Sequence, residues 1–453
     1  MKRQLIILLF VLVCSVVAGA QQRSFVPSCL GSNDTAKFTE IIAKIGSNQG
    51  VIRLTYDGSR CAVNNLTIPL NVTLDNTDGD GIKINAGQTL TDVGPIVNPV
   101  GKQLFHNALS GQGAVSFAGN RSLGQILPQW WGAVGDGKTN CTSAIQAAIN
   151  SASSAGAGTL FFPAGTYNHT GLTLKSGVNL VGIGKNRLGV VGLGSTLHNT
   201  NSSGGHALTI AFDNAVHGSL IEDLAIEGNG SSGHGLYMLG RSAADGGEVN
   251  AASELHVRNC MFNLNGKSGV YIYYAWPVIF EGCLFLQNSK YGVQLDKNAN
   301  AISFIGCHFQ GNILEGIYGS HTAGLTINGG AIEGNNQSSS AKNYDLHLDN
   351  AHGVAINGVY FEATTAGRCI DLGASTKGIL ISGNVFYINK EILGIYANGI
   401  RGFEVSAVIQ GNEFIGIDGG TGIHLGADVR DSIASPNSYS GKLDNNIIDK
   451  SKQ

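Results

Sequence analysis

Residues 278–309 read VIFEGCLFLQNSKYGVQLDKNANAISFIGCHF and contain two copies of the phrase that determines the fold. In most copies the phrase is an apolar residue, any residue, Gly, two further residues and then Phe or Ile. Weaker copies end at Ile226 and Ile448. The seven clear copies end 23 to 29 residues apart, at Phe262, Phe285, Phe309, Ile332, Phe361, Phe386 and Phe414. This period indicates a solenoid, because each repeat is a small unit that buries its apolar face only against its neighbours.

Apolar residues alternate within each unit, as they do along β-strands. Inward pairs such as Leu255 and Val257, or Val278 and Phe280, define a first strand. A second strand passes through the Phe or Ile, and a third begins at segments such as GVYI and GVQL. Three short strands and three bends per unit predict one coil of a parallel β-helix.

Two polar columns follow from this alignment. Asn tolerates the left-handed backbone of a bend and can bond the next coil, so we expect a stacked Asn ladder. Its expected members lie three residues after the Phe or Ile, at Asn229, Asn265, Asn288, Asn312, Asn335 and Asn389. The second column holds Cys260, Cys283 and Cys307 and later Asn384, Asn412 and Asn446. A straight column cannot surround a metal ion tetrahedrally, so we interpret these cysteines as buried thiols rather than as a metal or redox site.

The composition agrees with a strand-rich fold. The 453 residues include 65 Gly, and Gly costs roughly 1 kcal/mol at an interior helix position, which disfavours a helical bundle. The 28 Lys and Arg nearly balance the 31 Asp and Glu, and no basic run is interleaved with aromatic residues. We therefore do not expect nucleic acid as a partner.

The first twenty residues predict a signal peptide. Lys2 and Arg3 precede an apolar run over residues 5–17, and residues 18–20 are the small residues that a signal peptidase accepts. The run is too short to span a bilayer, and no later segment is long enough, so we expect no membrane span. We expect a secreted protein, extracellular or periplasmic, with an N-terminal β module at residues 21–127 and the β-helix at residues 128–453.

Export makes disulfides possible. Seven cysteines follow the predicted cleavage site, and an odd number leaves at least one unpaired. Cys29 and Cys61 are the pair that we predict, because both lie in the N-terminal segment. The sequence has no Cys or His spacing typical of a zinc site, and Asp75, Asp78 and Asp80 are typical of turns rather than of a calcium loop. We therefore predict no metal and no other cofactor.

Residues 131–149 read WGAVGDGKTNCTSAIQAAI, and FPAGTY follows at residues 162–167. Thr142 can cap a helix whose apolar residues share one face, and this helix would cover the open end of the coil stack. The stretch resembles the first coil of the pectate lyase superfamily, which includes polygalacturonase relatives and phage tailspike depolymerases. The resemblance covers about residues 128–450. It implies an all-β, right-handed parallel β-helix with an N-terminal capping helix.

The chain departs from this family's patterns at several positions. Trp131 replaces a Phe, and Asn140 and Cys141 replace acidic residues. Of the polygalacturonase motifs only Gly-His-Gly at residues 233–235 is present, and the third strand lacks the basic residue of a pectate lyase. The resemblance therefore does not imply a standard pectin enzyme.

We expect the functional site on the outward side of the third strand. Aromatic faces pack on sugar rings, while His, Asp and Gln bond hydroxyl groups, so such a column predicts a polysaccharide track. The alternative is that Tyr occupies these positions for its strand propensity. The predicted substrate-binding residues are Tyr237, Tyr271, Gln294, Tyr318, Tyr396 and His424, and the same column includes His347 and Asp371.

Asp349, Asp371 and His347 are the predicted catalytic residues. The two Asp residues lie one coil apart and two residues along the strand, which separates them by roughly 8 Å. This separation suits an inverting glycoside hydrolase, with one carboxyl protonated as the acid. Glu333 and Glu362 share a column on another strand about 5 Å apart and are the alternative, retaining pair.

These features predict an exported β-helix protein that binds an extracellular polysaccharide. We expect a carbohydrate-active enzyme, a glycoside hydrolase or a lyase relative. The alternative is a non-catalytic carbohydrate-binding or adhesin-like surface protein on the same scaffold. An acidic cluster in the groove would favour the enzyme, and an aromatic track without close carboxylates would favour the binding protein.

Overall fold

The computed structural model describes residues 23–450 except residues 57, 121–122, 186–193, 243, 245–246, 248, 338–343, 363–366, 389–392, 398–404, 427–428 and 430–431. The signal peptide predicted at residues 1–20 lies outside these residues and stays a prediction. Among the described helices, none is long and apolar enough to cross a membrane.

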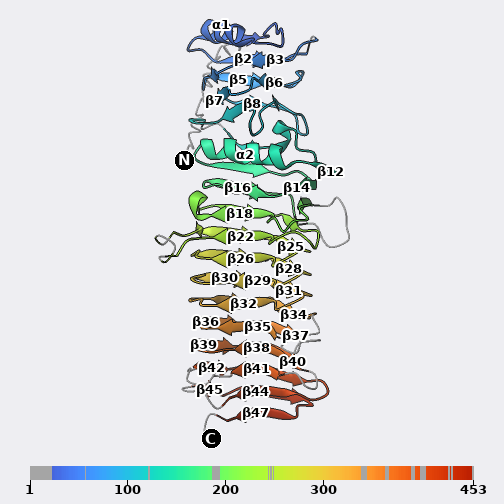
Figure 1. The fold of residues 1–453 in the computed structure, drawn as a ribbon, viewed down its shortest axis with the longest axis vertical. Helices are drawn as coiled ribbons and strands as arrows, with labels where there is room; N and C mark the ends of the chain where they lie inside the picture. Colours follow the sequence, from blue (N-terminus) through green and yellow to red (C-terminus); the bar gives the residue numbers. More distant parts are fainter. Residues whose placement is uncertain are drawn as a thin grey trace, which may run out of the picture.

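The chain winds into a parallel β-solenoid of about 15 turns, as the sequence predicts (Figure 1). Most strands form three long sheets, here called sheets 1 to 3, in which each strand pairs in parallel with its counterpart in the next coil. Sheet 1 contains β11 (Gln125–Ile126), β13 (Gly158–Phe161), β16 (Val178–Val181), β20 (Leu220–Glu222), β24 (Leu255–Arg258), β27 (Val278–Glu281), β30 (Ile302–Ile305), β33 (Thr326–Asn328), β36 (His352–Asn357), β39 (Lys377–Ser382), β42 (Ala407–Gln410) and β45 (Ile433–Ala434).

The second strand of each coil builds sheet 2, and the third builds sheet 3. Sheet 2 contains β12 (Asp136–Asn140), β14 (Gly165–His169), β17 (Ser195–Asn199), β21 (Ala225–Glu227), β25 (Met261–Asn263), β28 (Leu284–Leu286), β31 (His308–Gln310), β34 (Ala331–Glu333), β37 (Tyr360–Glu362), β40 (Val385–Ile388), β43 (Glu413–Gly416) and β46 (Ser438–Gly441). Sheet 3 contains β15 (Leu172–Thr173), β18 (Leu208–Ala211), β22 (Leu236–Leu239), β26 (Val270–Tyr273), β29 (Val293–Leu295), β32 (Ile317–Ser320), β35 (Tyr344–Asp349), β38 (Arg368–Leu372), β41 (Leu393–Ala397), β44 (Thr421–Leu425) and β47 (Asn445–Asp449).

The N-terminal segment forms three small parallel sheets that continue the stack (Figure 1). They contain β1 (Arg23–Phe25), β2 (Gly50–Arg53), β5 (Val72–Asp75) and β8 (Ile96–Val97); β3 (Cys61–Val63), β6 (Ile82–Ile84) and β9 (Phe105–His106); and β4 (Leu66–Ile68), β7 (Thr89–Asp92) and β10 (Ala114–Ser116). Helix α1 (Thr35–Ile45) covers their first coil. The predicted disulfide between Cys29 and Cys61 is confirmed and ties the chain before α1 to β3.

Helix α2 (Thr142–Ser154) packs on β13 of sheet 1 and on β10, so it lies between the main stack and the N-terminal coils. A short 3-10 helix (Pro128–Trp131) precedes it, and minor elements elsewhere are a 3-10 helix (Phe212–Asn214) and the paired strands β19 (Val216–His217) and β23 (Ala252–Ser253). The expected cap by Thr142 is wrong. Asn140 Oδ1 instead accepts the backbone N–H and the hydroxyl of Thr142 at 3.0 and 2.6 Å.

The predicted Phe column is confirmed as a buried stack. Neighbouring rings lie nearly parallel, with centroids 5.4 Å apart between Phe262 and Phe285 and 4.7 Å apart between Phe285 and Phe309. Each of these three rings is 0% exposed. The prediction for Ile448 is wrong, because Ile448 pairs with His424 in sheet 3 and Tyr439 follows Phe414 in the ring column.

The predicted Asn ladder is also present. Side-chain amides donate from Asn265 to Asn288, from Asn288 to Asn312 and from Asn312 to Asn335 at 2.9, 2.9 and 2.7 Å. Asp345 then accepts from Asn335 at 3.2 Å and ends the ladder. Among the other expected members, Asn229 is exposed and bonds Asn201 outside the ladder, and Asn389 lies outside the described residues.

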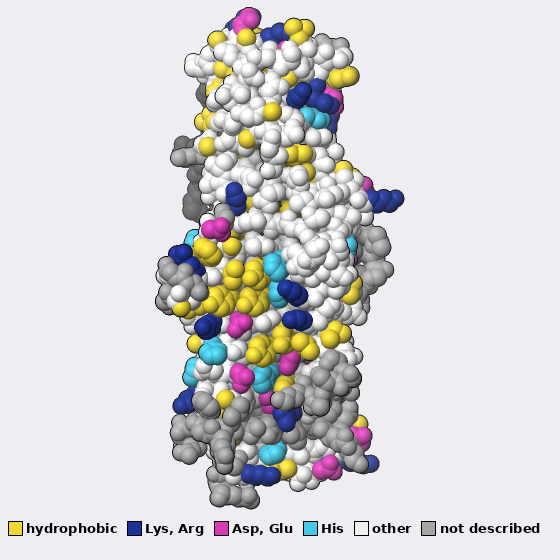
Figure 2. Space-filling model, in the orientation of Figure 1, with side chains coloured by type: hydrophobic (Ala, Val, Ile, Leu, Met, Phe, Trp, Pro, Cys, Tyr) yellow, Lys and Arg dark blue, Asp and Glu magenta, His cyan; other side chains and the backbone are white. Residues whose placement is uncertain are grey.

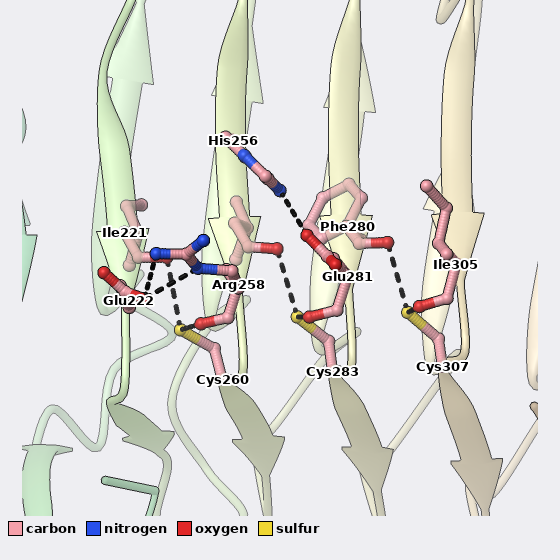
Figure 3. Close-up of polar contacts among 11 residues, drawn as sticks. Ile221, Glu222, His256, Arg258, Cys260, Phe280, Glu281, Cys283, Ile305 and Cys307 are labelled. Carbon is pink, nitrogen blue, oxygen red and sulfur yellow. Dashed lines mark hydrogen bonds and ion pairs between the residues drawn. The ribbon is translucent and has the colours of Figure 1, made fainter.

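The cysteine column is a buried stack in which each thiol bonds across to the preceding coil (Figure 3). The thiols of Cys260, Cys283 and Cys307 donate to carbonyl groups of that coil at 3.5, 3.4 and 3.4 Å. Later coils hold Asn384, Asn412 and Asn437 at this bend. The expected Asn446 is wrong, because it lies in β47 of sheet 3.

The ring column gives the first test of the coil register. Phe309→Ala should lower the free energy of unfolding by about 3–5 kcal/mol, because it removes a fully buried ring. Urea denaturation would measure this loss. Ile305→Ala is the control, since Ile305 is 42% exposed and a surface change costs about 0.5 kcal/mol or less. Equal losses at the two positions would contradict the buried column.

Asp345 gives a second test, because its burial raises its pKa to about 8. Between about pH 4 and pH 8 the native state holds a proton that the unfolded chain releases, so the free energy of unfolding should fall as the pH rises through this window. Asp345→Asn mimics the protonated form and should remove this slope in urea titrations. Asp78→Asn, at an exposed turn, should keep it. An unchanged slope in Asp345→Asn would contradict a buried, protonated Asp345.

Candidate functional site

The outward positions of sheet 3 form three columns that run along the stack. The predicted column is confirmed as one in-register row, from β22 to β44, at Tyr237, Tyr271, Gln294, Tyr318, His347, Asp371, Tyr396 and His424. Two residues further along each strand, a second column holds Tyr273, Asp296, Ser320 and Asp349. Tyr396 is in register through its backbone, and its side chain lies outside the described part of the chain.

A third column lies at the bend before sheet 3, and the sequence analysis missed it. Backbone bonds between successive coils align its members, which are His206, His234, Ser268, Tyr291, Glu315, Tyr344 and Arg368. Bends lack the alternation that marks a strand, so periodicity did not identify these positions. The available signal was the residue directly before the Gly that opens the third strand, as in His234-Gly235 and Glu315-Gly316.

Four rings at the N-terminal part of this face form a stack that we call the aromatic platform: His206, His234, Tyr237 and Tyr271. Ring centroids are 3.9 Å apart between His206 and Tyr237 and 5.2 Å apart between Tyr237 and Tyr271. Burial, aided by Lys267, lowers the pKa of His206 to about 4 and that of His234 to about 3. The platform is therefore neutral at physiological pH. Figure 2 shows hydrophobic side chains, histidines and basic residues gathered in the middle of this face.

A second group lies further along the stack, and we call it the acid–base cluster: His347, Asp349, Asp371 and Arg368. Nδ1 of His347 is 2.7 Å from Asp371, and Nε2 is 3.3 Å from Asp349. Nη1 of Arg368 contacts the other oxygen of Asp371 at 2.8 Å. Both Asp371 oxygens are therefore bonded, and its side chain is only 7% exposed, whereas that of Asp349 is 39% exposed.

These contacts decide the protonation of the cluster. Burial alone would lower the pKa of His347, but hydrogen bonds to Asp349 and Asp371 outweigh it and raise the pKa to about 9. The same bond to His347 lowers the pKa of Asp349. His347 is therefore an imidazolium and Asp349 a carboxylate near neutral pH, so Asp349 does not meet the expectation of a protonated groove carboxyl.

The rings of Tyr318 and Tyr344 hold the His347 imidazolium in place. Their centroids are 5.6 and 5.0 Å from that of His347, with interplanar angles of 13° and 18°. The guanidinium of Arg368 lies 5.1 Å from the centre of the Tyr344 ring, and its Nη1 donates to the Tyr344 hydroxyl at 3.1 Å. The imidazolium is thus fixed by stacking as well as by its two ion pairs.

The remaining candidates are arranged differently. Gln294 accepts a hydrogen bond from Ser268 at 3.3 Å, and burial lowers the pKa of His424. Glu333 and Glu362 are in register on sheet 2, as expected, but on a different face from the cluster. Glu333 pairs with His308 at 2.9 Å, and Glu362 accepts from the Tyr360 hydroxyl at 2.7 Å. Over the described part of the chain, no group of three His, Cys, Asp or Glu side chains could hold a metal ion.

Two family models match the chain. One, described as rhamnogalacturonase A/epimerase, pectate lyase-like, matches residues 130–195, and one described as a right handed beta helix region matches residues 166–337. The chain is a right-handed β-helix protein of the pectate lyase-like family. The expected resemblance and fold class are both confirmed.

Sequence relatives of this β-helix protein come from Azotobacter vinelandii. Alginate lyase 7 is 29% identical over 208 residues, which are 38% of this chain and 23% of that protein. Mannuronan C5-epimerase AlgE2 is 27% identical over 255 residues, which are 48% of this chain and 23% of that protein. The chain therefore spans less than a quarter of the length of these relatives.

Solved structures share the fold. The enzymatically active domain of bacteriophage CBA120 tailspike protein 2 has a TM-score of 0.52 at 16% identity, over 67% of this chain and 45% of that chain. The A-module of Azotobacter vinelandii mannuronan C-5 epimerase AlgE6 has a TM-score of 0.51 at 17% identity, over 72% of this chain and 98% of that chain. At these identities the likeness concerns the fold alone.

The paired aspartates give a direct test of the cluster. His347 should keep both ring protons at pH 8 and lose one only near pH 9, because two carboxylates stabilise the imidazolium. Nitrogen-15 NMR of the imidazole rings would measure this, with the neutral His234 as an internal reference. Asp371→Asn should move the His347 titration to lower pH. A wild-type His347 that titrates near 6.5 would contradict the bridging arrangement.

Proposed function

We propose that this β-helix protein is an exported enzyme that cleaves an extracellular anionic polysaccharide along the outer face of sheet 3. The observation that carries the proposal is the continuity of this face, where an aromatic platform leads in register to an acid–base cluster. The named substrates of alginate lyase 7 and mannuronan C5-epimerase AlgE2 support a polysaccharide as the ligand. The Cys29–Cys61 disulfide supports export, because disulfides persist in oxidising compartments.

Binding is assigned to the aromatic platform and to the basic residues beside it. The faces of Tyr237 and Tyr271 offer apolar area to sugar rings, while their hydroxyl groups remain available to hydrogen bonding. The charges of Lys267 and Lys290 act on His234 within the platform, so both lysines lie close to it. Two cations beside neutral rings favour a polymer that carries carboxylates.

Catalysis is assigned to the exposed side of the acid–base cluster. Asp349 is ionised and 39% exposed, so it can accept a proton as the general base. Gly373 in the next coil leaves room for it, because a Cβ at this position would lie 1.9 Å from Asp349 Oδ1. Asp371, buried and bonded to Arg368, acts as a positioning residue that orients His347.

A non-catalytic binding protein is the second candidate, and one observation favours it. Both ring nitrogens of His347 already face carboxylates, so the imidazole has no free nitrogen for chemistry unless an ion pair opens. On this reading the cluster stabilises the coil stack and the aromatic platform alone holds the polymer. The two candidates differ in whether wild-type protein releases a product.

The enzyme proposal predicts turnover on an acidic polymer. Wild-type protein should cleave at least one of alginate, polygalacturonate and hyaluronan, with new reducing ends in all cases and unsaturated products if the reaction is elimination. Asp349→Asn should still bind that polymer but lose at least about a hundredfold in kcat, the scale of general base catalysis. Reducing-end assays, absorbance of unsaturated products and affinity electrophoresis would measure these effects.

Two variants separate the alternatives. Tyr271→Ala should weaken binding, whereas Glu333→Gln, on sheet 2, should leave kcat unchanged. A loss of turnover in Glu333→Gln with full activity in Asp349→Asn would move the site to the Glu333 and Glu362 pair. Binding without any product from the wild type would favour the non-catalytic protein.

A further inference from the structure

Glu315, at the bend before β32, is a buried carboxyl that the acid–base cluster leaves unused. It is only 9% exposed. Among the described residues its carboxyl takes part in no ion pair, and it accepts a hydrogen bond from its own backbone N–H. A buried carboxyl without a cation partner is costly to ionise, so its presence on this face calls for a role.

The surroundings of Glu315 are aromatic and belong to the proposed binding face. Tyr291 and Tyr344 occupy the same bend column in the coils before and after it, and Tyr318 follows three residues later. The Tyr291 and Tyr318 rings stack with centroids 5.0 Å apart. The charge of Glu315 acts on the phenol groups of Tyr291, Tyr318 and Tyr344, so the carboxyl lies among these rings.

The proton of Glu315 is also in electrostatic contact with the acid–base cluster. Burial raises its pKa, the imidazolium of His347 opposes this rise, and the carboxylate of Asp371 adds to it. The buried Asp345 interacts with it as well. Glu315 and Asp349 therefore differ in protonation, because burial favours the acid at one and an ion pair favours the carboxylate at the other.

We infer that Glu315 is the general acid of this site and donates its proton to the glycosidic oxygen that leaves. This inference rests on the proposed function. The bond between the sugar carbon and that oxygen breaks with its electron pair moving to oxygen, which takes the Glu315 proton and leaves a carboxylate. Asp349 takes the matching proton, from the water that adds to the sugar carbon in hydrolysis, or from the carbon beside the uronate carboxyl as a double bond forms in elimination.

The inference separates the roles of the two carboxyl groups by pH. Activity should fall on the alkaline side as Glu315 loses its proton, at a pH above the usual range of a Glu because its pKa is raised. It should fall on the acidic side as Asp349 gains one, at a pH below the usual range of an Asp. The window between the two limbs is the working range of the enzyme.

A leaving-group experiment tests the inference. Glu315→Gln keeps the shape of the side chain and should lower kcat on alginate, or on whichever panel polymer the wild type cleaves fastest, by at least about a hundredfold. The same variant should retain activity within about tenfold on a p-nitrophenyl glycoside of an oligosaccharide from that polymer, because nitrophenolate leaves without a proton. The alkaline limb of the pH profile should disappear.

Controls keep the outcomes distinct. Glu281→Gln changes a carboxyl on sheet 1, outside this face, and should match the wild type on both substrates. If Glu315→Gln does not fold by circular dichroism, Glu315→Asp retains the acid and should shift the alkaline limb while lowering kcat. Wild-type turnover with an equal loss on both substrates in Glu315→Gln, or with no loss, would overturn the inference and leave the proposed function standing. A wild type without turnover on any polymer would overturn both.

Discussion

Parallel, in-register pairing between successive coils is the constraint on which the rest of the structure depends. Each strand bonds the equivalent strand of the next coil about 4.8 Å away, so each sequence position becomes a column along the stack. A column repeats its chemistry at close range. Aromatic rings can therefore stack, amides can form a ladder, and like charges in one column must find partners of opposite charge. The ring column through Phe309 and the ladder through Asn288 are the two internal columns that hold this register.

The sequence predicted the columns that alternate and missed those that do not. Inward and outward positions of a strand differ at every second residue, so the Phe row and the Tyr271 row could both be identified from periodicity. Bends have no such period, and the column of Glu315 and Tyr344 was not found. Near the C-terminus the predictions for Asn446 and Ile448 are wrong, because the alignment followed residue type and assigned positions of sheet 3 to an earlier strand.

Contacts between coils also lay beyond sequence reasoning. The separation estimated for Asp349 and Asp371 treated them as two independent carboxyl groups across a gap. In the structure His347 fills that gap and bonds both, which makes one aspartate a buried positioning group and leaves the other exposed. Column spacing fixes where side chains start, but rotamers and partner choice decide where their charges end.

The outer face of sheet 3 departs from the internal logic of the ladder at one level of the stack. Where other coils place Gly at the inner side of the third-strand bend, this coil places Asp345, which accepts from Asn335 and has burial raise its pKa to about 8. Glu315 lies one coil earlier, and His347 follows two residues after Asp345. Three ionisable groups with displaced pKa values thus gather within two coils. Structural packing alone gives no benefit from two buried carboxyl groups beside an imidazolium, whereas proton transfer requires groups whose protonation differs at one pH. The clustering of these groups at the end of the aromatic platform is the physical reason to place chemistry there.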